Sequence, residues 1–148
     1  MKRLEIIRRV RSLTRDFSNS IFREQDIIDF LNEGINRAKQ IIPELKKEER
    51  LLTNQQELKF IPEEYRHLIA VYATARCFGQ DEGHYQATTF MNEFEIKMDE
   101  LRDKILNGDI IIVDPDTGEE ITDGGTGGID YVNLKPYWGI NSRIDGDE

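Results

Sequence analysis

Apolar residues recur at intervals of three and four positions through most of the first 107 residues, which is the spacing of one face of an α-helix. The pattern predicts four helices, over residues 2–14, 23–42, 62–79 and 84–107. Pro43 and the pair Asn107-Gly108 are expected to end the second and fourth helices. Pro62 is expected to open the third, because a proline at the first helical position loses no hydrogen bond.

The strongest periodic signal is the apolar stripe of the fourth predicted helix. The stripes of the second, third and fourth helices supply the expected core. Its predicted members are Ile27, Leu31, Ile35, Leu68, Val71, Tyr72, Met91, Phe94, Met98, Leu101 and Ile105. Gly34 interrupts the second helix as either a local weakness or a point of close helix contact.

Residues 44–61 show no helical spacing. Two short apolar pieces flank the polar run 53–56, which indicates either a small hairpin or a structured loop. The predicted fold is therefore all-α. It is a four-helix bundle with a small loop or hairpin between helices two and three, followed by an extended C-terminal tail with a short β element.

The last forty residues differ in kind, and we divide the chain into a helical core, 1–108, and a C-terminal tail, 109–148. The tail holds a β-branched run, a glycine-rich stretch at 124–128 and a Pro-Tyr-Trp cluster. A segment of this composition commonly becomes ordered on a partner, by adding to a sheet edge or inserting aromatic anchors. Folding back onto its own helices is the alternative. The predicted docking residues are Ile110, Ile111, Ile112, Val113, Tyr131, Leu134, Pro136, Tyr137 and Trp138.

Charge follows the same division. Residues 1–108 carry 18 Lys and Arg against 19 Asp and Glu, a net charge of −1, whereas residues 109–148 carry 2 against 10, a net charge of −8. The first fifteen residues are basic, but an acidic chain of net charge −9 argues against tight general nucleic-acid binding. The length fits one domain. No membrane span or secretory signal is expected, and the single Cys77 suits a reducing compartment.

No catalytic or metal-binding constellation is predicted, and no cofactor is expected. His67, His84 and Cys77 do not form the cluster of about four ligands that a zinc site needs. The neighbouring carboxylates Glu63 and Glu64, like the pair at 81–82, are explained by helix-start and loop positions.

Two motifs of the tail partly resemble ligand-binding loops, but each departs from the full pattern. Asp114, Asp116 and Glu119 resemble part of a calcium loop, but the glycine stands at the fifth position, Gly118, so an ordinary turn is favoured. The glycine-rich stretch lacks the Lys-Ser/Thr of a phosphate loop.

The order of these features resembles the head–tail adaptor, or head-completion, proteins of tailed bacteriophages. The matching stretches are residues 26–38 (DIIDFLNEGINRA), 60–65 (FIPEEY), 70–76 (AVYATAR) and 81–83 (DEG), all within the first 107 residues. Members of that family have an early amphipathic helix, an irregular loop, a helix that begins at a proline and a long final helix. The resemblance rests on the order and spacing of the stretches.

The resemblance implies a structural protein rather than an enzyme. Family members assemble as a twelve-fold ring on the portal protein, bridge it to a stopper or tail protein, and let DNA pass through the centre. It thus implies a place in the neck of the virion, after assembly in the host cytoplasm. In several relatives a C-terminal extension grips the portal, and residues 109–148 are the corresponding segment here.

Two other functions are weighed against the adaptor. A helical DNA-binding or regulatory module would use Arg8, Arg9 and Arg11 of the basic first helix and would bind DNA with strong salt dependence. An enzyme, such as a wall-degrading tail accessory, would depend on a particular carboxylate such as Glu64.

Two further expectations are that residues 1–108 fold without the tail and that Leu101→Asp unfolds the chain.

Overall fold

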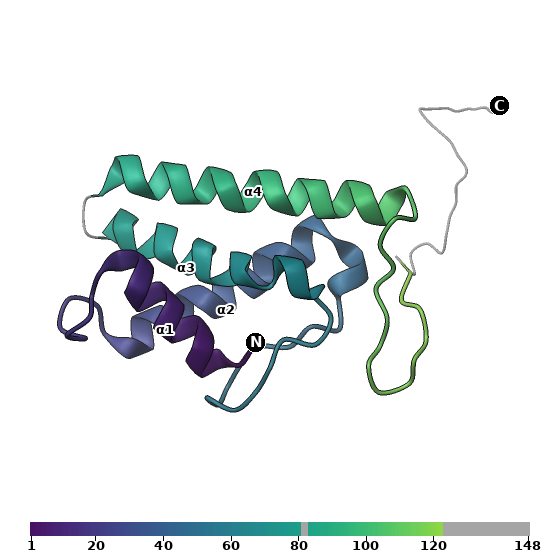
Figure 1. Ribbon diagram of the computed structural model, residues 1–148, viewed down its shortest axis with the longest axis horizontal. Helices are drawn as coiled ribbons and strands as arrows, with labels where there is room; N and C mark the ends of the chain where they lie inside the picture. The colour runs from purple at the N-terminus through teal and green to yellow at the C-terminus, as the bar shows by residue number, and fades with distance from the viewer. Residues whose placement is uncertain (81–82, 123–148) are drawn as a thin grey trace.

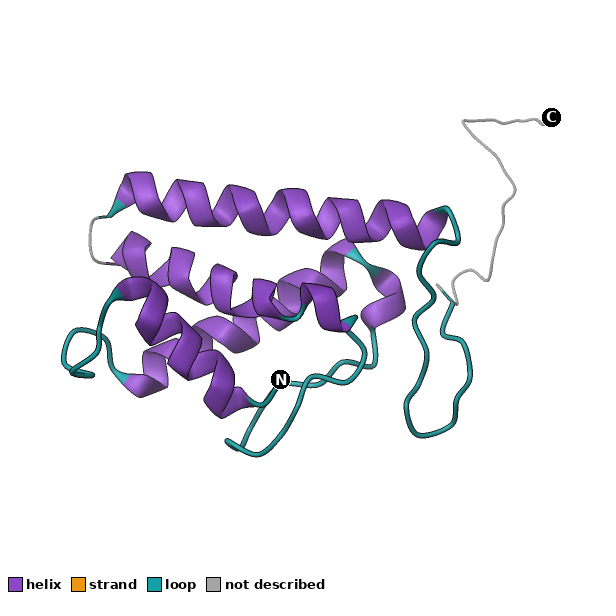
Figure 2. Cartoon of the chain, viewed as in Figure 1, coloured by secondary structure: helices purple, strands orange, loops and turns teal. Residues whose placement is uncertain are grey.

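The computed structural model describes residues 1–80 and 83–122. These residues form a mainly helical structure with four α-helices and no β-strand, as Figures 1 and 2 show. The α-helices are α1 (Arg3–Thr14), α2 (Glu24–Ile41), α3 (His67–Gln80) and α4 (His84–Leu106). Two short 3-10 helices, η1 (Pro43–Leu45) and η2 (Glu63–Tyr65), lie between α2 and α3. The prediction of a mainly helical chain with four helices is confirmed.

The central element is α3, which packs against α1, α2 and α4. In Figure 1, α4 runs along one side of α3, while α1 and α2 lie on the other. A helix that is apolar on all sides is stable when its neighbours cover it. The buried residues of α3 are Leu68, Ile69, Ala70, Val71, Tyr72, Ala73, Thr74, Ala75 and Cys77.

The predicted core stripes face inward. Nine of the eleven predicted core residues are buried, namely Ile27, Leu31, Ile35, Leu68, Val71, Tyr72, Phe94, Met98 and Leu101. Met91 and Ile105 are partly buried and pack against the core from α4. Ile105 lies in the last turn of α4, where fewer neighbours cover it, and Met91 lies two turns into the helix.

Gly34 is a point of close helix contact. A Cβ atom built on it would lie 3.0 Å from Cδ1 and 3.2 Å from Cβ of Tyr72. Since an ordinary carbon–carbon contact is about 3.5–4.0 Å, a larger residue would push α2 and α3 apart. The glycine therefore sets the distance between these helices.

The segment between α2 and α3 is a structured loop and not a hairpin. Part of its backbone pairs with the N-terminal residues, through an isolated antiparallel bridge between Lys2 and Glu57, and not within a hairpin. Other backbone groups of the loop bond to side chains. Asn32 accepts from the Leu51 N–H (2.8 Å) and donates to the Leu51 carbonyl (3.3 Å). The buried carboxylate of Glu48 accepts from the N–H groups of Lys59, Phe60 and Ile61 at 2.9–3.0 Å.

The prediction that Pro62 opens the third α-helix is wrong by one turn. Pro62 precedes η2, in which the Tyr65 N–H bonds to the Pro62 carbonyl, and α3 begins at His67. At the other end of the helical region, Gly108 has a φ of +82° and ends α4 as predicted.

Candidate docking surfaces

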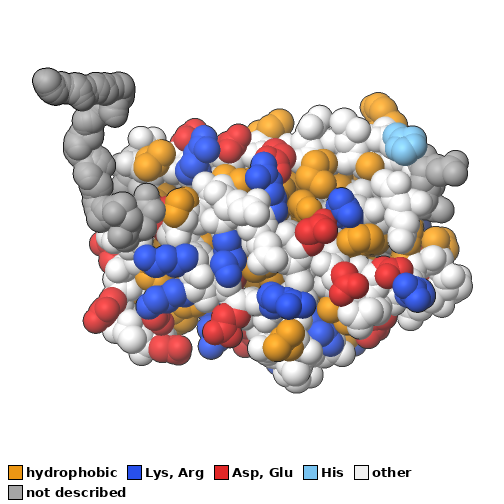
Figure 3. All heavy atoms as spheres, turned by 180° about the vertical axis from the view of Figure 1, so that it is seen from behind, with side chains coloured by type: hydrophobic (Ala, Val, Ile, Leu, Met, Phe, Trp, Pro, Cys, Tyr) orange, Lys and Arg blue, Asp and Glu red, His pale blue; other side chains and the backbone are white. Residues whose placement is uncertain are grey.

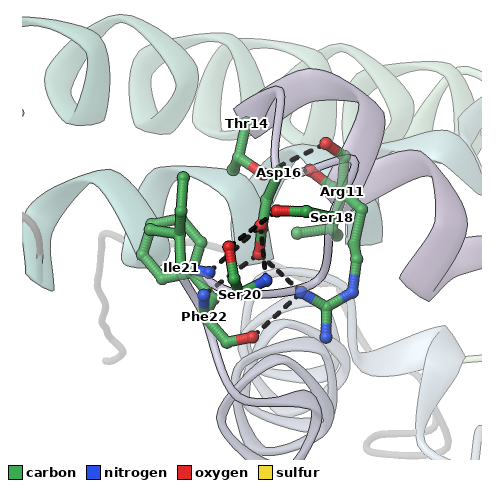
Figure 4. Close-up of polar contacts among 8 residues, drawn as sticks. Arg11, Thr14, Asp16, Ser18, Ser20, Ile21 and Phe22 are labelled. Atoms are coloured by element: carbon green, nitrogen blue, oxygen red, sulfur yellow. Dashed lines mark hydrogen bonds and ion pairs between the residues drawn. The ribbon is translucent and has the colours of Figure 1, made fainter.

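The loop between α1 and α2 is built around the buried carboxylate of Asp16 (Figure 4). Its Oδ1 accepts from the N–H groups of Ser20 (3.0 Å) and Ile21 (3.1 Å). Its Oδ2 accepts from the Phe22 N–H (3.0 Å) and from Nη1 of Arg11 (2.6 Å). The same Arg11 nitrogen also donates to the Phe22 carbonyl at 2.9 Å. The loop is thereby fixed to the C-terminal half of α1.

Electrostatics favours the charged form of this carboxylate. Burial by itself raises the pKa of Asp16, but the hydrogen bonds from Phe22, Ile21 and Ser20, and then the charge of Arg11, outweigh it and leave the pKa below 3.8. The sequence shows residues 16–20 as turn formers. What it misses is that Arg11 is the buried partner of Asp16.

This fixed loop displays two large apolar side chains. Phe17 is 74% exposed and Ile21 is 57% exposed. The start of α4 lies at the same end of the molecule (Figure 1) and carries Tyr85, which is 83% exposed. We call Phe17 and Ile21 the loop-end surface.

A second apolar group lies at the opposite end, where α4 ends and residues 107–122 begin (Figure 1). It consists of Leu106, Ile111 and Val113, which are 72%, 55% and 43% exposed. We call it the tail-end surface. Viewed from behind, apolar side chains reach the surface at several places across the molecule (Figure 3).

The predicted docking run Ile110–Val113 is divided by the fold. Ile111 and Val113 are exposed as expected, but Ile110 is partly buried against the core and Ile112 is 2% exposed. Ile121 is also buried, and its N–H bonds to the Ile112 carbonyl at 2.8 Å. The expectation that Ile112 is free to dock is wrong for this conformation, because residues 109–122 fold back onto the helices. The predicted boundary at 108 therefore cuts through the core.

The turn at residues 114–118 is an ordinary turn stabilised by its first aspartate. The Asp116 N–H donates to Oδ1 of Asp114 (2.9 Å), and Oδ2 of Asp114 lies 3.6 Å from Nζ of Lys47. The hydrogen bond from the Asp116 N–H lowers the pKa of Asp114 most. Burial raises this pKa, but the charge of Lys47 lowers it further, so it stays below its usual range. Asp114, the first residue of the pattern that resembles a calcium loop, thus stabilises a turn and forms an ion pair. The remaining predicted docking residues, Tyr131, Leu134, Pro136, Tyr137 and Trp138, lie outside the described residues.

An open cleft of about 1090 Å³ lies between the C-terminal end of α2, residues 46–60 and the turn at 114–116. Residues 39–66 contribute six cationic side chains to its lining, Lys39, Lys46, Lys47, Arg50, Lys59 and Arg66. The same residues contribute three carboxylates, Glu48, Glu49 and Glu57, and the turn adds Asp114 and Asp116, so the lining has a net charge of +1. Leu52, which is 65% exposed, and the partly buried Phe60 add apolar surface. The lining therefore combines a net positive charge with apolar contact area.

The basic first helix is less available than its sequence suggests. Arg11 is buried against Asp16, and Arg3 donates to Oδ1 of Asn54 (2.9 Å) and to the Leu51 carbonyl (3.3 Å). Arg8 and Arg9 are exposed. Arg11, one of the three arginines considered for DNA binding, thus serves the fold, as does Arg3.

The residues considered for chemistry lie apart from one another in the structure. His67 and His84 begin different helices, and Cys77 is buried, which raises the pKa of its thiol to about 12. Glu63 and Glu64 are exposed on η2. Within residues 1–80 and 83–122, no group of three or more His, Cys, Asp or Glu could hold a metal ion. No helix in the described part is long and apolar enough to cross a membrane.

Comparison of the chain with protein-family models, with curated proteins and with solved structures finds no match.

Proposed function

We propose that this chain is a structural head–tail connector subunit of a tailed bacteriophage. In this proposal it forms a ring on the portal protein and bridges it to the stopper or tail, and DNA passes through the channel. It works in the neck of the virion and is assembled in the host cytoplasm. A four-helix bundle with a C-terminal docking tail, forming a ring of twelve copies, belongs to the same proposal.

The observation that carries the proposal is the presence of two different apolar surfaces at opposite ends of one small protein. Large exposed apolar side chains commonly mark protein–protein contacts. A subunit that uses two unlike surfaces makes head-to-tail contacts, which close into a ring when the rotation permits. The loop-end surface is also held in place by Asp16, and such preorganisation reduces the entropy lost on binding.

The stretches that carry the family resemblance have compatible structural positions. Residues 26–38 lie within α2, and residues 70–76 lie within α3, where all of them except Arg76 are buried. Residues 60–65 form the turn that precedes α3. These positions support the proposal because they belong to the fold of the subunit rather than to a separate site.

The test is purification of the tagged chain from phage-producing cells, followed by electron microscopy of the complexes. The expected result is ring-shaped particles that contain the portal protein. Phe17→Ser combined with Ile21→Ser should abolish these particles. Ile96→Ser is the control, because Ile96 is 65% exposed but lies in the middle of α4. Recovery with nucleic acid and without virion proteins would contradict the proposal and favour the DNA-binding module, which Arg8→Ala with Arg9→Ala would then test.

A further inference from the structure

We propose that the acidic C-terminal segment, residues 123–148, binds in the basic cleft of its own chain. The cleft is the one lined by residues 39–66 and the turn at 114–116. This inference does not depend on the proposed function, because it concerns a contact within one chain.

The first argument is the charge of the two surfaces. The whole lining carries six cations against five carboxylates, Glu48, Glu49, Glu57, Asp114 and Asp116, a net charge of +1. Glu48 is one of those carboxylates, and it is buried and accepts three backbone N–H groups, so its charge is partly compensated within the protein. Residues 123–148 carry five Asp and Glu against Lys135 and Arg143, a net charge of −3.

The second argument is that an acidic part of the tail already lies in the cleft. Residues 109–122 carry five carboxylates and no Lys or Arg. Of these carboxylates, Asp114 and Asp116 line the cleft, and Asp114 pairs with Lys47 at 3.6 Å. Lys46 and Arg50 are exposed in the same lining. The cleft therefore accepts the carboxylates of an adjoining peptide, and further cations are available to the residues that follow.

The third argument is apolar complementarity. Leu52 is 65% exposed in the lining, next to surface contributed by Phe60 and Pro115. Residues 131–138 contain two tyrosines, a leucine and a tryptophan, and they lie between Asp130 and the acidic residues at 145–148. Aromatic side chains commonly contribute most of the binding free energy when they cover such an apolar surface. A segment with acidic ends and an aromatic centre can make both kinds of contact with this lining.

Geometry favours the segment of the same chain over that of a second copy. Residues 123–148 comprise 26 residues, which can extend over roughly 85 Å. They are attached at Thr122, next to Ile121, which is anchored in the core beside the turn that lines the cleft. A tethered segment has an effective concentration on the order of millimolar, far above that of a free second copy.

The full-length chain provides its own probe, because Trp138 is the single tryptophan and lies in the segment. Acrylamide quenching of its fluorescence measures how far it is shielded from solvent. In the wild-type chain we expect quenching several-fold weaker than for a free tryptophan amide. The double variant Lys46→Glu with Arg50→Glu reverses two charges of the cleft. It should lower the ratio of shielded to exposed Trp138 by about tenfold. Added salt should act in the same direction.

Arg8→Glu with Arg9→Glu is the matched control, because it makes the same change of charge on exposed residues of α1 that do not line the cleft. This variant should leave the quenching as in the wild type. Circular dichroism should show the same helix content in both variants, which excludes unfolding as the cause. Three results would overturn the inference: Trp138 quenched as freely as the amide, equal shielding in the cleft variant, or shielding that increases with protein concentration, which would indicate a second copy.

Discussion

Replacing Asp16 by alanine tests whether the α1–α2 loop is stabilised by one buried carboxylate. The substitution leaves Nη1 of Arg11 with the Phe22 carbonyl as its remaining partner and removes the acceptor of three backbone N–H groups. Removing one partner of a buried ion pair costs about 3–5 kcal/mol. Ser20 and Ile21 are exposed, so their N–H groups can bond to water instead. We therefore expect a loss of about 3 kcal/mol, at the lower end of that range.

The assay is urea unfolding followed by circular dichroism, together with thermal melting. A loss of about 3 kcal/mol corresponds to a decrease in Tm of roughly 6–12 °C for a chain of this size. Asp29→Ala is the control, because Asp29 is exposed and accepts one hydrogen bond from the side chain of Gln25. It should change the stability by less than about 0.5 kcal/mol. Equal effects of the two substitutions would refute the assigned role of Asp16.

The difference in free energy of unfolding between wild type and Asp16→Ala should depend on pH, because the Asp16 carboxylate titrates. Its pKa in the folded chain lies below the ordinary value of 3.8. A carboxyl group with a lowered pKa contributes stability that is fully present above its unfolded pKa and is lost as the pH falls through its folded pKa. The stability difference between wild type and Asp16→Ala should therefore be constant near neutral pH and decrease below pH 3.8. A difference that stays constant into acid would show that the charge contributes little.

Three further predictions concern the core. Gly34→Ala should destabilise the chain by about 1–3 kcal/mol in urea unfolding, because the new Cβ meets Tyr72. Gly79→Ala is the control, because the nearest atom to a Cβ at Gly79 is 3.9 Å away. It should be neutral or stabilise the chain by up to about 1 kcal/mol. Leu101→Asp places a charge at a fully buried position and should abolish the cooperative melting transition; a near-normal Tm would contradict the assigned core. The thiol of Cys77, with its pKa raised to about 12, should react with a thiol reagent at pH 8 only when urea unfolds the chain.

The α-helices could be predicted from the sequence because their signals are local. Apolar spacing fixes which side of α2 and α4 faces inward, and Pro43 and Gly108 end helices through their own backbone preferences. The exposed apolar residues of the loop between α1 and α2 could not be identified as a surface in this way. Their exposure depends on how Asp16 and Arg11 position the backbone around them.

The sequence determined the helices, the inward stripes and the separation of a neutral N-terminal part from an acidic C-terminal one, because each depends on residues close together in the chain. The tertiary structure decided which groups meet across long separations. It paired Gly34 with Tyr72, Arg3 with Asn54 and Lys47 with Asp114. It also buried Ile112, a residue that composition alone assigned to a partner. Burial depends on which surfaces the packed helices leave uncovered, and that is a property of the whole fold.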